Sequence, residues 1–334
     1  MRVSPARLVR TELLRPGEML PLLVQPTLHE VDLIGWVRGN RQAIETALLQ
    51  HGAVLFRGFK IGSAPVFQQF AASVTPHLLE YIEGASPRLP VGDKVYTSTE
   101  YPAAYAIAMH NELSYSHTWP GMLFFCCLEA PQQGGETPIA DSRKVFALLA
   151  PEIIERFKHR GVKYVRNFHG GHGSGQSWQT VFATTDQAVV EAYCREGGIS
   201  WHWKADGGLR VSQVRPAYIK HPQTGELVWF NQAHQWHLSN LEPDIARAMG
   251  AAVPEAELPM HAYYGDGALL EPFVLDAIRT AYQQATVTFP WQAGDILLLD
   301  NMLTAHGRMP FIGPRTVLVA MGAPLSLHDV RETP

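Results

Sequence analysis

The sequence has few cysteines and little charge, and both shortages narrow the class of protein. Only three cysteines occur in 334 residues, so no disulfide framework is expected. Free cysteine usually behaves as a small buried hydrophobic residue, and we expect this of Cys126, Cys127 and Cys194. Charged residues make up 17% of the chain against 46% hydrophobic residues. This balance argues against intrinsic disorder and predicts a sizeable core.

The chain also lacks a strong excess of charge and any long hydrophobic run. Its formal net charge is −4, and Lys and Arg do not gather into runs like those that bind nucleic acid. The first 26 residues mix four arginines with short apolar stretches, which fits neither a signal peptide nor a membrane span. We therefore expect a cytoplasmic protein with no nucleic-acid or membrane partner.

Neither an internal repeat nor a phosphate-binding glycine fingerprint is present, so the fold class must come from the hydrophobic pattern. Helical spacing occurs over 32–50, 66–79 and 144–157, and a long loop is expected over 83–102. Strand patterns occur over 53–56, 122–128, 227–230, 286–289, 296–299 and 315–321.

Strands dominate the middle and end of the chain. This favours a mainly β fold with helical insertions, a double-stranded β-helix or jelly roll, over a doubly wound sheet. We expect residues 1–334 to form a single domain. Its N-terminal elaboration would cover about 1–80, and its core about 81–323 with an insertion over about 141–285.

His110 and Glu112 form the first candidate metal motif. In a strand, residues i and i+2 point to the same face, so both side chains would reach one ion. With 15 histidines and 31 acidic residues, one or two such pairs are expected by chance. The distant His306, which follows the apolar run 296–299, would complete a set of two histidines and one carboxylate. Such a facial triad leaves positions open on iron(II), whereas a structural zinc site takes four protein ligands.

Arg315 is the candidate for binding an anionic co-substrate. It opens the strand expected over 315–321 and, by the period of two, shares a face with Val317 and Val319. If that face lines the barrel, a dicarboxylate such as 2-oxoglutarate would neutralise the buried guanidinium. The alternative is an arginine paired with an Asp or Glu of the protein.

These residues resemble the taurine dioxygenase and clavaminate synthase-like superfamily of iron(II)/2-oxoglutarate oxygenases. The resemblance covers roughly 53–321 and rests on the segments 98–102 (STEYP), 110–115 (HNELSY), 134–138 (GGETP) and 306–315. It implies that His110, Glu112 and His306 are the catalytic iron ligands. It also implies that Thr137 and Arg315 bind 2-oxoglutarate and that dioxygen is consumed.

The identity of the carboxylate residue among the three implied iron ligands also implies a substrate class. Taurine dioxygenase-like members usually have Asp there, whereas Glu112 is similar to clavaminate synthase-like and syringomycin-type hydroxylases. Related halogenases replace this carboxylate with a small residue, so the resemblance implies hydroxylation of an amino acid or its derivative, with release of succinate and CO2. Several syringomycin-type relatives serve natural-product biosynthesis on tethered substrates, so a carrier protein is an alternative partner to a free small molecule.

Substrate contacts are expected from two further segments. Arg166 precedes the glycine-rich loop 169–175 and would meet a substrate carboxylate; a structural arginine that fixes the loop is the alternative. Asn231 and Gln232 resemble the Phe-Asn-Gln segment of syringomycin-type hydroxylases and would orient an amino group. His169, His172, His234 and His237 are spaced in pairs that zinc sites also use, but we assign none of them to metal.

Other functions remain open from the sequence. The same cofactors support desaturation, cyclisation or oxidative cleavage. A jelly roll also serves as a non-catalytic binding protein, because fold does not fix function. A zinc hydrolase would use the same three ligands, but it has no evident need for a buried cation such as Arg315 facing the metal.

Overall fold

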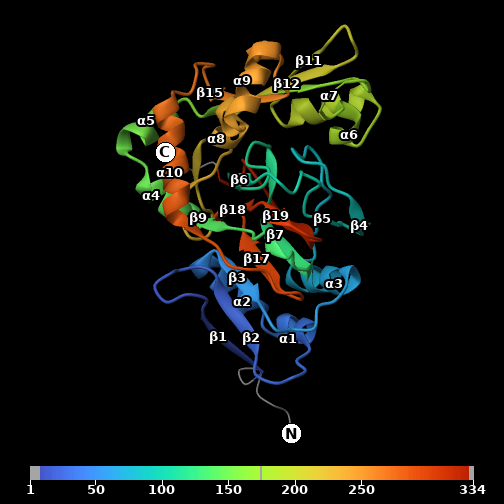
Figure 1. The fold of residues 1–334 in the computed structure, drawn as a ribbon, viewed down its shortest axis with the longest axis vertical. Coiled ribbons are helices and arrows are strands. Elements are labelled where there is room, and N and C mark those ends of the chain that lie inside the picture. Colours follow the sequence, from blue (N-terminus) through green and yellow to red (C-terminus); the bar gives the residue numbers. More distant parts are fainter. Residues whose placement is uncertain (1–7, 174, 331–334) are drawn as a thin grey trace.

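The largest sheet is assembled from both ends of the chain. The structure, a computed structural model, describes residues 8–173 and 175–330. Strands from near the two termini pair directly with each other, in the order β1-β2-β3-β17-β7-β20-β5-β4 (Figure 1). In that order the bounds are Val9–Leu13, Leu22–Pro26, Ala53–Phe56, Ile296–Asp300, Thr118–Glu129, Thr316–Ser326, Val95–Thr97 and Pro90–Gly92.

A second sheet faces the first and completes the jelly roll, which confirms the expected fold class. Its order is β16-β9-β18-β6, with bounds Thr286–Val287, Ile139–Asp141, Thr304–Arg308 and Ile107–His110. Alternate residues of β7 divide between two cores. Phe125 and Cys127 pack with Ile139 and Val287 of the second sheet, whereas Phe124 faces the other way.

Three helices cover the outer face of the large sheet: α1 (Leu33–Gly39), α2 (Arg41–His51) and α3 (Ala64–Val74). The helix expected over 32–50 is divided at Asn40, whose φ of −129° is not helical. The helix expected over 66–79 stops at Val74, because Thr75 precedes a proline and is extended.

Much of the segment between β9 and β16 lies above the barrel in Figure 1, while its helices α4 (Ser142–Leu148) and α10 (Pro272–Ala285) run along the side of the barrel near β9. The segment contains a four-stranded sheet in the order β11-β12-β10-β15, with bounds Ser200–Trp203, Leu209–Arg215, Val162–Phe168 and Met260–Tyr264. Its other helices are α5 (Pro151–Lys158), α6 (Trp178–Phe182), α7 (Gln187–Glu196), α8 (Ala233–Trp236), α9 (Pro243–Ala252), and the 3-10 turns Leu238–Asn240 and Glu255–Glu257. The helix expected over 144–157 is therefore two helices, and Pro151 begins the second.

Two small ladders complete the fold: β13 (Tyr218–Lys220) with β14 (Leu227–Trp229), and β8 (Gln133–Gly134) with β19 (Phe311–Ile312).

The expected loop over 83–102 is irregular except for β4 and β5. The described residues of 169–173 and 175 lie outside helices and strands, apart from a single bridge at His169. All three cysteines are buried and free, as expected.

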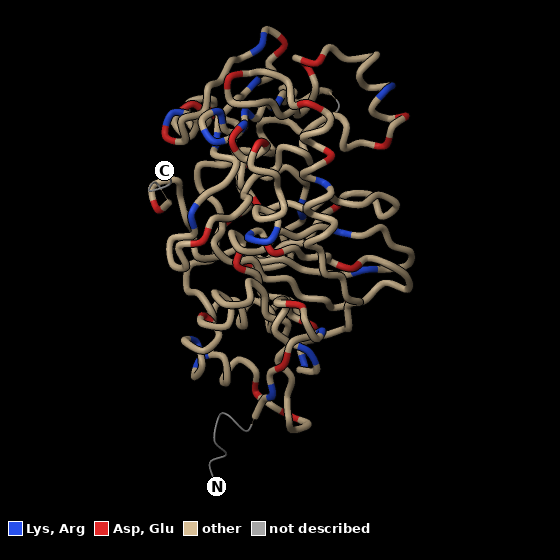
Figure 2. Tube along the Cα trace, turned by 90° about the vertical axis from the view of Figure 1, so that its left-hand side faces the viewer, with Lys and Arg blue, Asp and Glu red and all other residues tan. Residues whose placement is uncertain are grey.

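Charged residues of both signs are interspersed along the chain (Figure 2). Among the residues described, no helix combines the length and apolar composition needed to cross a bilayer.

Candidate active site

The three expected metal ligands meet where β6 pairs with β18. His110 ends β6, His306 is the middle residue of β18, and the two lie opposite each other in the antiparallel register. Oε2 of Glu112 lies 3.8 Å from Nε2 of His110 and 3.7 Å from Nε2 of His306. All the ligating atoms lie within 4.8 Å of one another, and no other group of at least three His, Cys, Asp or Glu in residues 8–173 and 175–330 is arranged to hold a metal.

Glu112 reaches the histidines for a different reason from the one the sequence suggested. The alternation argument needed a strand through 110–112, but β6 ends at His110 and Glu112 lies in a turn. The next residue, Leu113, has a φ of +56°. The backbone N–H of Glu112 donates to Oδ1 of Asn301 at 2.8 Å, so the end of β17 fixes the turn.

The hydrogen bonds and charges around the three side chains suit a divalent cation. Nδ1 of His110 donates to the carbonyl of Ala108 at 2.9 Å, which leaves Nε2, the nitrogen nearer Glu112, for a metal. Burial, and then His110, lower the pKa of His306 well below its usual value, so this ring is neutral. Burial alone would raise the pKa of Glu112, but Arg88 and the two histidines hold it below the usual range. The neutral ring of His306, Nε2 of His110 and the Glu112 carboxylate are the ligand types that fit iron(II) with open positions.

Arg88 belongs to this site and was missed by the sequence analysis. Its Nη2 donates to Oε2 of Glu112 at 2.8 Å, and its side chain is only 5% exposed. The guanidinium also lies over the ring of Tyr81, 4.6 Å from its centroid. A single arginine in an irregular loop has no spacing signal, so only the folded loop reveals it.

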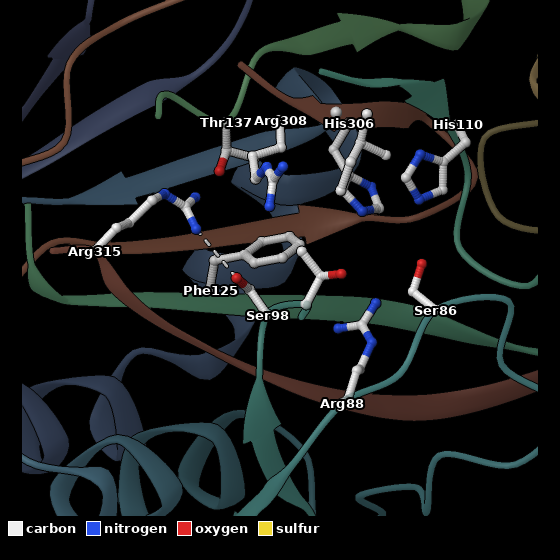
Figure 3. A pocket seen from close by; sticks show the side chains of 12 residues that line it. Ser86, Arg88, Ser98, His110, Phe125, Thr137, His306, Arg308 and Arg315 are labelled. Carbon is white, nitrogen blue, oxygen red and sulfur yellow. Dashed lines mark hydrogen bonds between the residues drawn. The ribbon is translucent and has the colours of Figure 1, made fainter. Parts of the chain in front are cut away.

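A cavity of about 390 Å³ leads from the two histidines to Arg315 (Figure 3). Nε of Arg315 donates to the carbonyl of Gly135 at 2.9 Å, and Nη1 donates to Oγ of Ser98 at 3.2 Å. Within the described part of the chain, no Asp or Glu forms an ion pair with Arg315, so the alternative of a protein ion pair is not realised. Burial, and then Arg308, lower the pKa of Arg315 to about 10, as befits a cation without a neutralising partner.

Thr137 lines the same cavity as Arg315. Its Oγ1 accepts a hydrogen bond from Nε1 of Trp291 at 3.2 Å, which leaves its own hydroxyl proton for a ligand. Gly135, two residues before Thr137, has a φ of +72°, and an added Cβ would lie 3.1 Å from Cδ of Arg315. The Gly-Gly-x-Thr element therefore lets the chain turn tightly beside the guanidinium.

A second, wider cavity of about 980 Å³ meets the first at His110. Both cavities are lined by Ser86, Arg88, Ile107 and His110. The wider one continues between aromatic and amide side chains that include Tyr81, Tyr115, Gln232, Gln235 and Trp236. The narrow cavity thus ends at the guanidinium of Arg315, and the wide cavity is large enough for a substrate.

Gln232 is the one expected substrate residue that lines a cavity, and both ends of its amide are already bonded. Nε2 donates to the carbonyl of Asn111 at 2.8 Å, and Oε1 accepts from Nε1 of Trp236 at 2.9 Å. Asn231 lines neither cavity and donates to the carbonyl of Ala217 at 2.6 Å. Its position therefore does not support the expected contact with a substrate amino group.

Arg166 also lines neither cavity. Its guanidinium donates to the carbonyls of Glu83 at 2.8 Å and Gly84 at 3.0 Å, and to Oε1 of Gln176 at 3.2 Å. The expected contact with a substrate carboxylate is not supported by this position. The contacts of Arg166 agree better with the alternative of a structural arginine, because they connect the loop over 83–88 to the glycine-rich segment.

The four histidines left unassigned to metal lie outside the triad. His234 is buried against Tyr282, with ring centroids 4.8 Å apart, and His237 packs against His261 at 4.7 Å. His169 accepts a hydrogen bond from the backbone of Gly171. None of these residues, nor His172, belongs to the candidate metal group.

Comparison with known proteins places this site in a family. Residues 21–321 match the family described as "Taurine catabolism dioxygenase TauD, TfdA family". A dapdiamide synthesis protein, DdaC, from Enterobacter agglomerans is 42% identical over 286 residues, covering 86% of each chain. A clavaminate synthase-like protein from Arabidopsis thaliana is 30% identical over 314 residues, covering 92% of this chain and 89% of that one.

Solved structures support the same fold. PvcB from Pseudomonas aeruginosa superimposes with a TM-score of 0.57 at 16% identity, covering 100% of this chain and 98% of that chain. A second PvcB structure is described as an Fe, alpha-ketoglutarate dependent oxygenase. The chain belongs to the TauD/TfdA family and is an iron(II)/2-oxoglutarate-dependent dioxygenase that acts on a small molecule.

Proposed function

We propose that the protein hydroxylates an unactivated C–H bond of an amino-acid-derived substrate in natural-product biosynthesis. His110, Glu112 and His306 hold iron(II), and Thr137 and Arg315 hold the carboxylate of 2-oxoglutarate remote from the metal. The observation that carries this assignment is the half-buried Arg315, which no described Asp or Glu neutralises, in a cavity that begins at His110 and His306. A dianion that chelates iron at one end and meets a guanidinium at the other fits both features.

Two observations support the amino-acid class. The carboxylate ligand is Glu112, as in amino-acid hydroxylases that the sequence resembles. The relative from E. agglomerans, of which this chain covers 86%, is named for dapdiamide synthesis.

The bound metal supplies the activation of dioxygen, coupled to conversion of 2-oxoglutarate to succinate and CO2. The protein's own residues mainly position the reactants. Arg315 and the hydroxyl of Thr137 fix the co-substrate in the narrow cavity. Ile107 and Phe125 line its wall and limit the space for water beside His306. The substrate enters the wide cavity, where its reacting carbon comes to lie near the open side of the metal ligands.

Desaturation or cyclisation is the alternative reaction at the same site. Mass spectrometry of the product separates these outcomes, because hydroxylation adds one oxygen atom and desaturation removes two hydrogen atoms. A substrate bound to a carrier protein is the alternative to a free one; a screen that compares free and carrier-tethered forms of one amino acid tests this.

We also propose that the whole chain acts as one domain. Support comes from β17, which pairs with β3 of the N-terminal region on one side and with β7 on the other. The N-terminal strands are thereby part of the sheet that carries the site.

The first test is an anaerobic titration of the protein with iron(II) and 2-oxoglutarate, followed by visible absorption. Chelation of iron(II) by 2-oxoglutarate gives a weak metal-to-ligand charge-transfer band. We expect the band in the wild type, its loss in His306→Ala, and its retention in the control His159→Ala, whose side chain is 78% exposed. A folded, iron-loaded wild type without the band would contradict the proposal and favour a zinc hydrolase or a binding protein.

A further inference from the structure

The wide cavity contains one cation and one acid, and both lie at the metal end. Among the described residues that line it, Arg88 is the single Lys or Arg and Glu112 is the single Asp or Glu. Glu112 is a metal ligand and already accepts a hydrogen bond from Arg88. No carboxylate is therefore left in this wall to pair with a substrate ammonium group.

The protein does not provide a hydrogen-bond acceptor for every N–H group of the Arg88 guanidinium. Nη2 donates to Glu112 and the guanidinium also interacts with the side chain of Tyr81, but Nε and Nη1 are buried and make no well-formed hydrogen bond within the protein. Buried polar groups are nearly always hydrogen-bonded, and an unpaired guanidinium N–H is costly. Figure 3 shows Arg88 rising from its loop toward the space below the two histidines. An anion in the wide cavity would satisfy these donors.

The position of Arg88 is fixed before any ligand arrives. Its guanidinium lies over Tyr81. The loop that carries it is held at Glu83, whose carboxylate accepts hydrogen bonds from Ser116 and Tyr193 at 2.6 and 2.8 Å. A charged donor group that is held in place loses little conformational freedom when it binds an anion.

A second unpaired polar group lies elsewhere in the wall. Oε1 of Gln235 is buried without a hydrogen-bond partner. A secondary amide offers both a donor and an acceptor, so it would satisfy Gln235 in either orientation of the side-chain amide. The wall nearby is apolar and aromatic, with Trp236, Leu241 and Met260.

From these observations we infer that Arg88 is the substrate's carboxylate-binding residue and that the substrate is an N-acylated amino acid rather than a free one. The inference rests on the proposed function and names its substrate class. The carboxylate meets Arg88, the amide meets Gln235, and the side chain lies against the apolar wall. N-acylation removes the ammonium charge, for which the cavity has no free partner.

Binding measurements test this with three ligands that differ in charge: N-acetyl-L-leucine, N-acetyl-L-leucinamide and L-leucinamide. Isothermal titration calorimetry uses the manganese(II)-loaded protein, with and without 2-oxoglutarate. We expect the anion to bind at least about tenfold more tightly than the neutral amide, and the cation to bind most weakly. The same three derivatives of methionine and of phenylalanine repeat the comparison with other side chains.

Two variants assign the preference to Arg88. We expect Arg88→Gln to abolish the preference for acid over amide and Arg88→Lys to retain part of it, each at confirmed manganese occupancy. Equal binding of acid and amide by the wild type in all three series would overturn the inference, as would an unchanged preference in Arg88→Gln. Loss of 2-oxoglutarate binding in Arg88→Gln would instead assign this arginine to the co-substrate.

The calorimetric result is separate from the test of the proposed function. A wild type that does not bind 2-oxoglutarate contradicts the oxygenase assignment of the narrow cavity. The acid-over-amide preference, measured without 2-oxoglutarate, still decides the role of Arg88.

Discussion

The side-chain amide of Asn301 bonds to both backbone groups of Glu112. Oδ1 of Asn301 accepts from the N–H of Glu112 at 2.8 Å, and Nδ2 donates to the Glu112 carbonyl at 2.9 Å and to the Pro120 carbonyl at 2.8 Å. Asn301 is fully buried and follows β17, far along the chain from Glu112. One amide thus fixes the turn that carries the carboxylate ligand.

Replacing Asn301 with Ala should weaken metal binding as well as the fold. The change leaves three buried backbone groups without partners, so we expect unfolding to become easier by about 3 kcal/mol. Loss of a group that orients a metal ligand typically lowers metal affinity by about 10–100-fold. Urea unfolding and a competition titration with a metal chelator measure the two effects.

The control for this variant is Asn231→Ala, which removes another fully buried amide that contacts the backbone of Ala217 and Ala233 but not Glu112. We expect a similar loss of stability with unchanged metal affinity. Equal metal affinity in Asn301→Ala and the wild type would refute the positioning role of Asn301.

Arg315→Gln should reduce the affinity for 2-oxoglutarate. Hydrogen bonds to a charged group contribute about 1.5–3 kcal/mol, so the dissociation constant should rise by about 10–100-fold, and by less in Arg315→Lys. Calorimetry with the manganese(II)-loaded protein measures it. Arg247→Gln is the control, because Arg247 is exposed and pairs only with Asp244. An affinity in Arg315→Gln equal to that of this control would show that the co-substrate does not use Arg315.

The sequence predicted which residues form the candidate metal group better than it predicted the path of the chain between them. His110, Glu112 and His306 are chemically distinctive, and their motif places them without knowledge of the backbone. The turn at Glu112 depends on the positive φ of Leu113 and on the hydrogen bond that the N–H of Glu112 donates to Asn301, 189 positions along the chain. Neither leaves a pattern in the local sequence.

The local sequence also does not reveal which side chains line the substrate cavity. Arg166 and Asn231 have suitable side chains beside suitable segments, but the direction of a side chain follows from packing. Both point to backbone carbonyls instead of a cavity. Arg88 shows the converse, since its loop carries no periodic signal and only the folded structure brings it to Glu112. Two expected helices are each divided in two, at Asn40 and at Pro151, and the helix expected over 66–79 ends early at Val74. The helices α6 to α10 were not predicted.

Glu83→Ala should destabilise the protein strongly, although Glu83 is not a metal ligand. The side chain is 1% exposed and accepts hydrogen bonds from Ser116, Tyr193 and Gln213. Leaving these buried donors unpaired should cost about 3 kcal/mol or more, measured by urea unfolding. The exposed Glu80→Ala should change stability by less than about 0.5 kcal/mol. Matching urea midpoints for the two variants would rule out this role for Glu83.

The pH dependence of stability should contain a contribution from His234. Burial, followed by Arg279 and His110, lowers the pKa of His234 from 6.5 to about 3. Below pH 6.5 the unfolded chain binds a proton at this residue, but the folded protein does not until about pH 3. The stabilisation is therefore complete above pH 6.5 and is lost progressively as the pH falls toward 3.

At pH 5 this loss amounts to about 2 kcal/mol, because the pH is then 1.5 units below the unfolded pKa. Urea unfolding of the metal-free protein at pH 7 and pH 5 measures it. His306 and His237 also have lowered pKa values, so the informative quantity is the difference between the wild type and His234→Gln. The variant should lose about 2 kcal/mol less than the wild type on acidification. The same loss in both proteins would mean that His234 is already protonated, or hydrated, in the folded state.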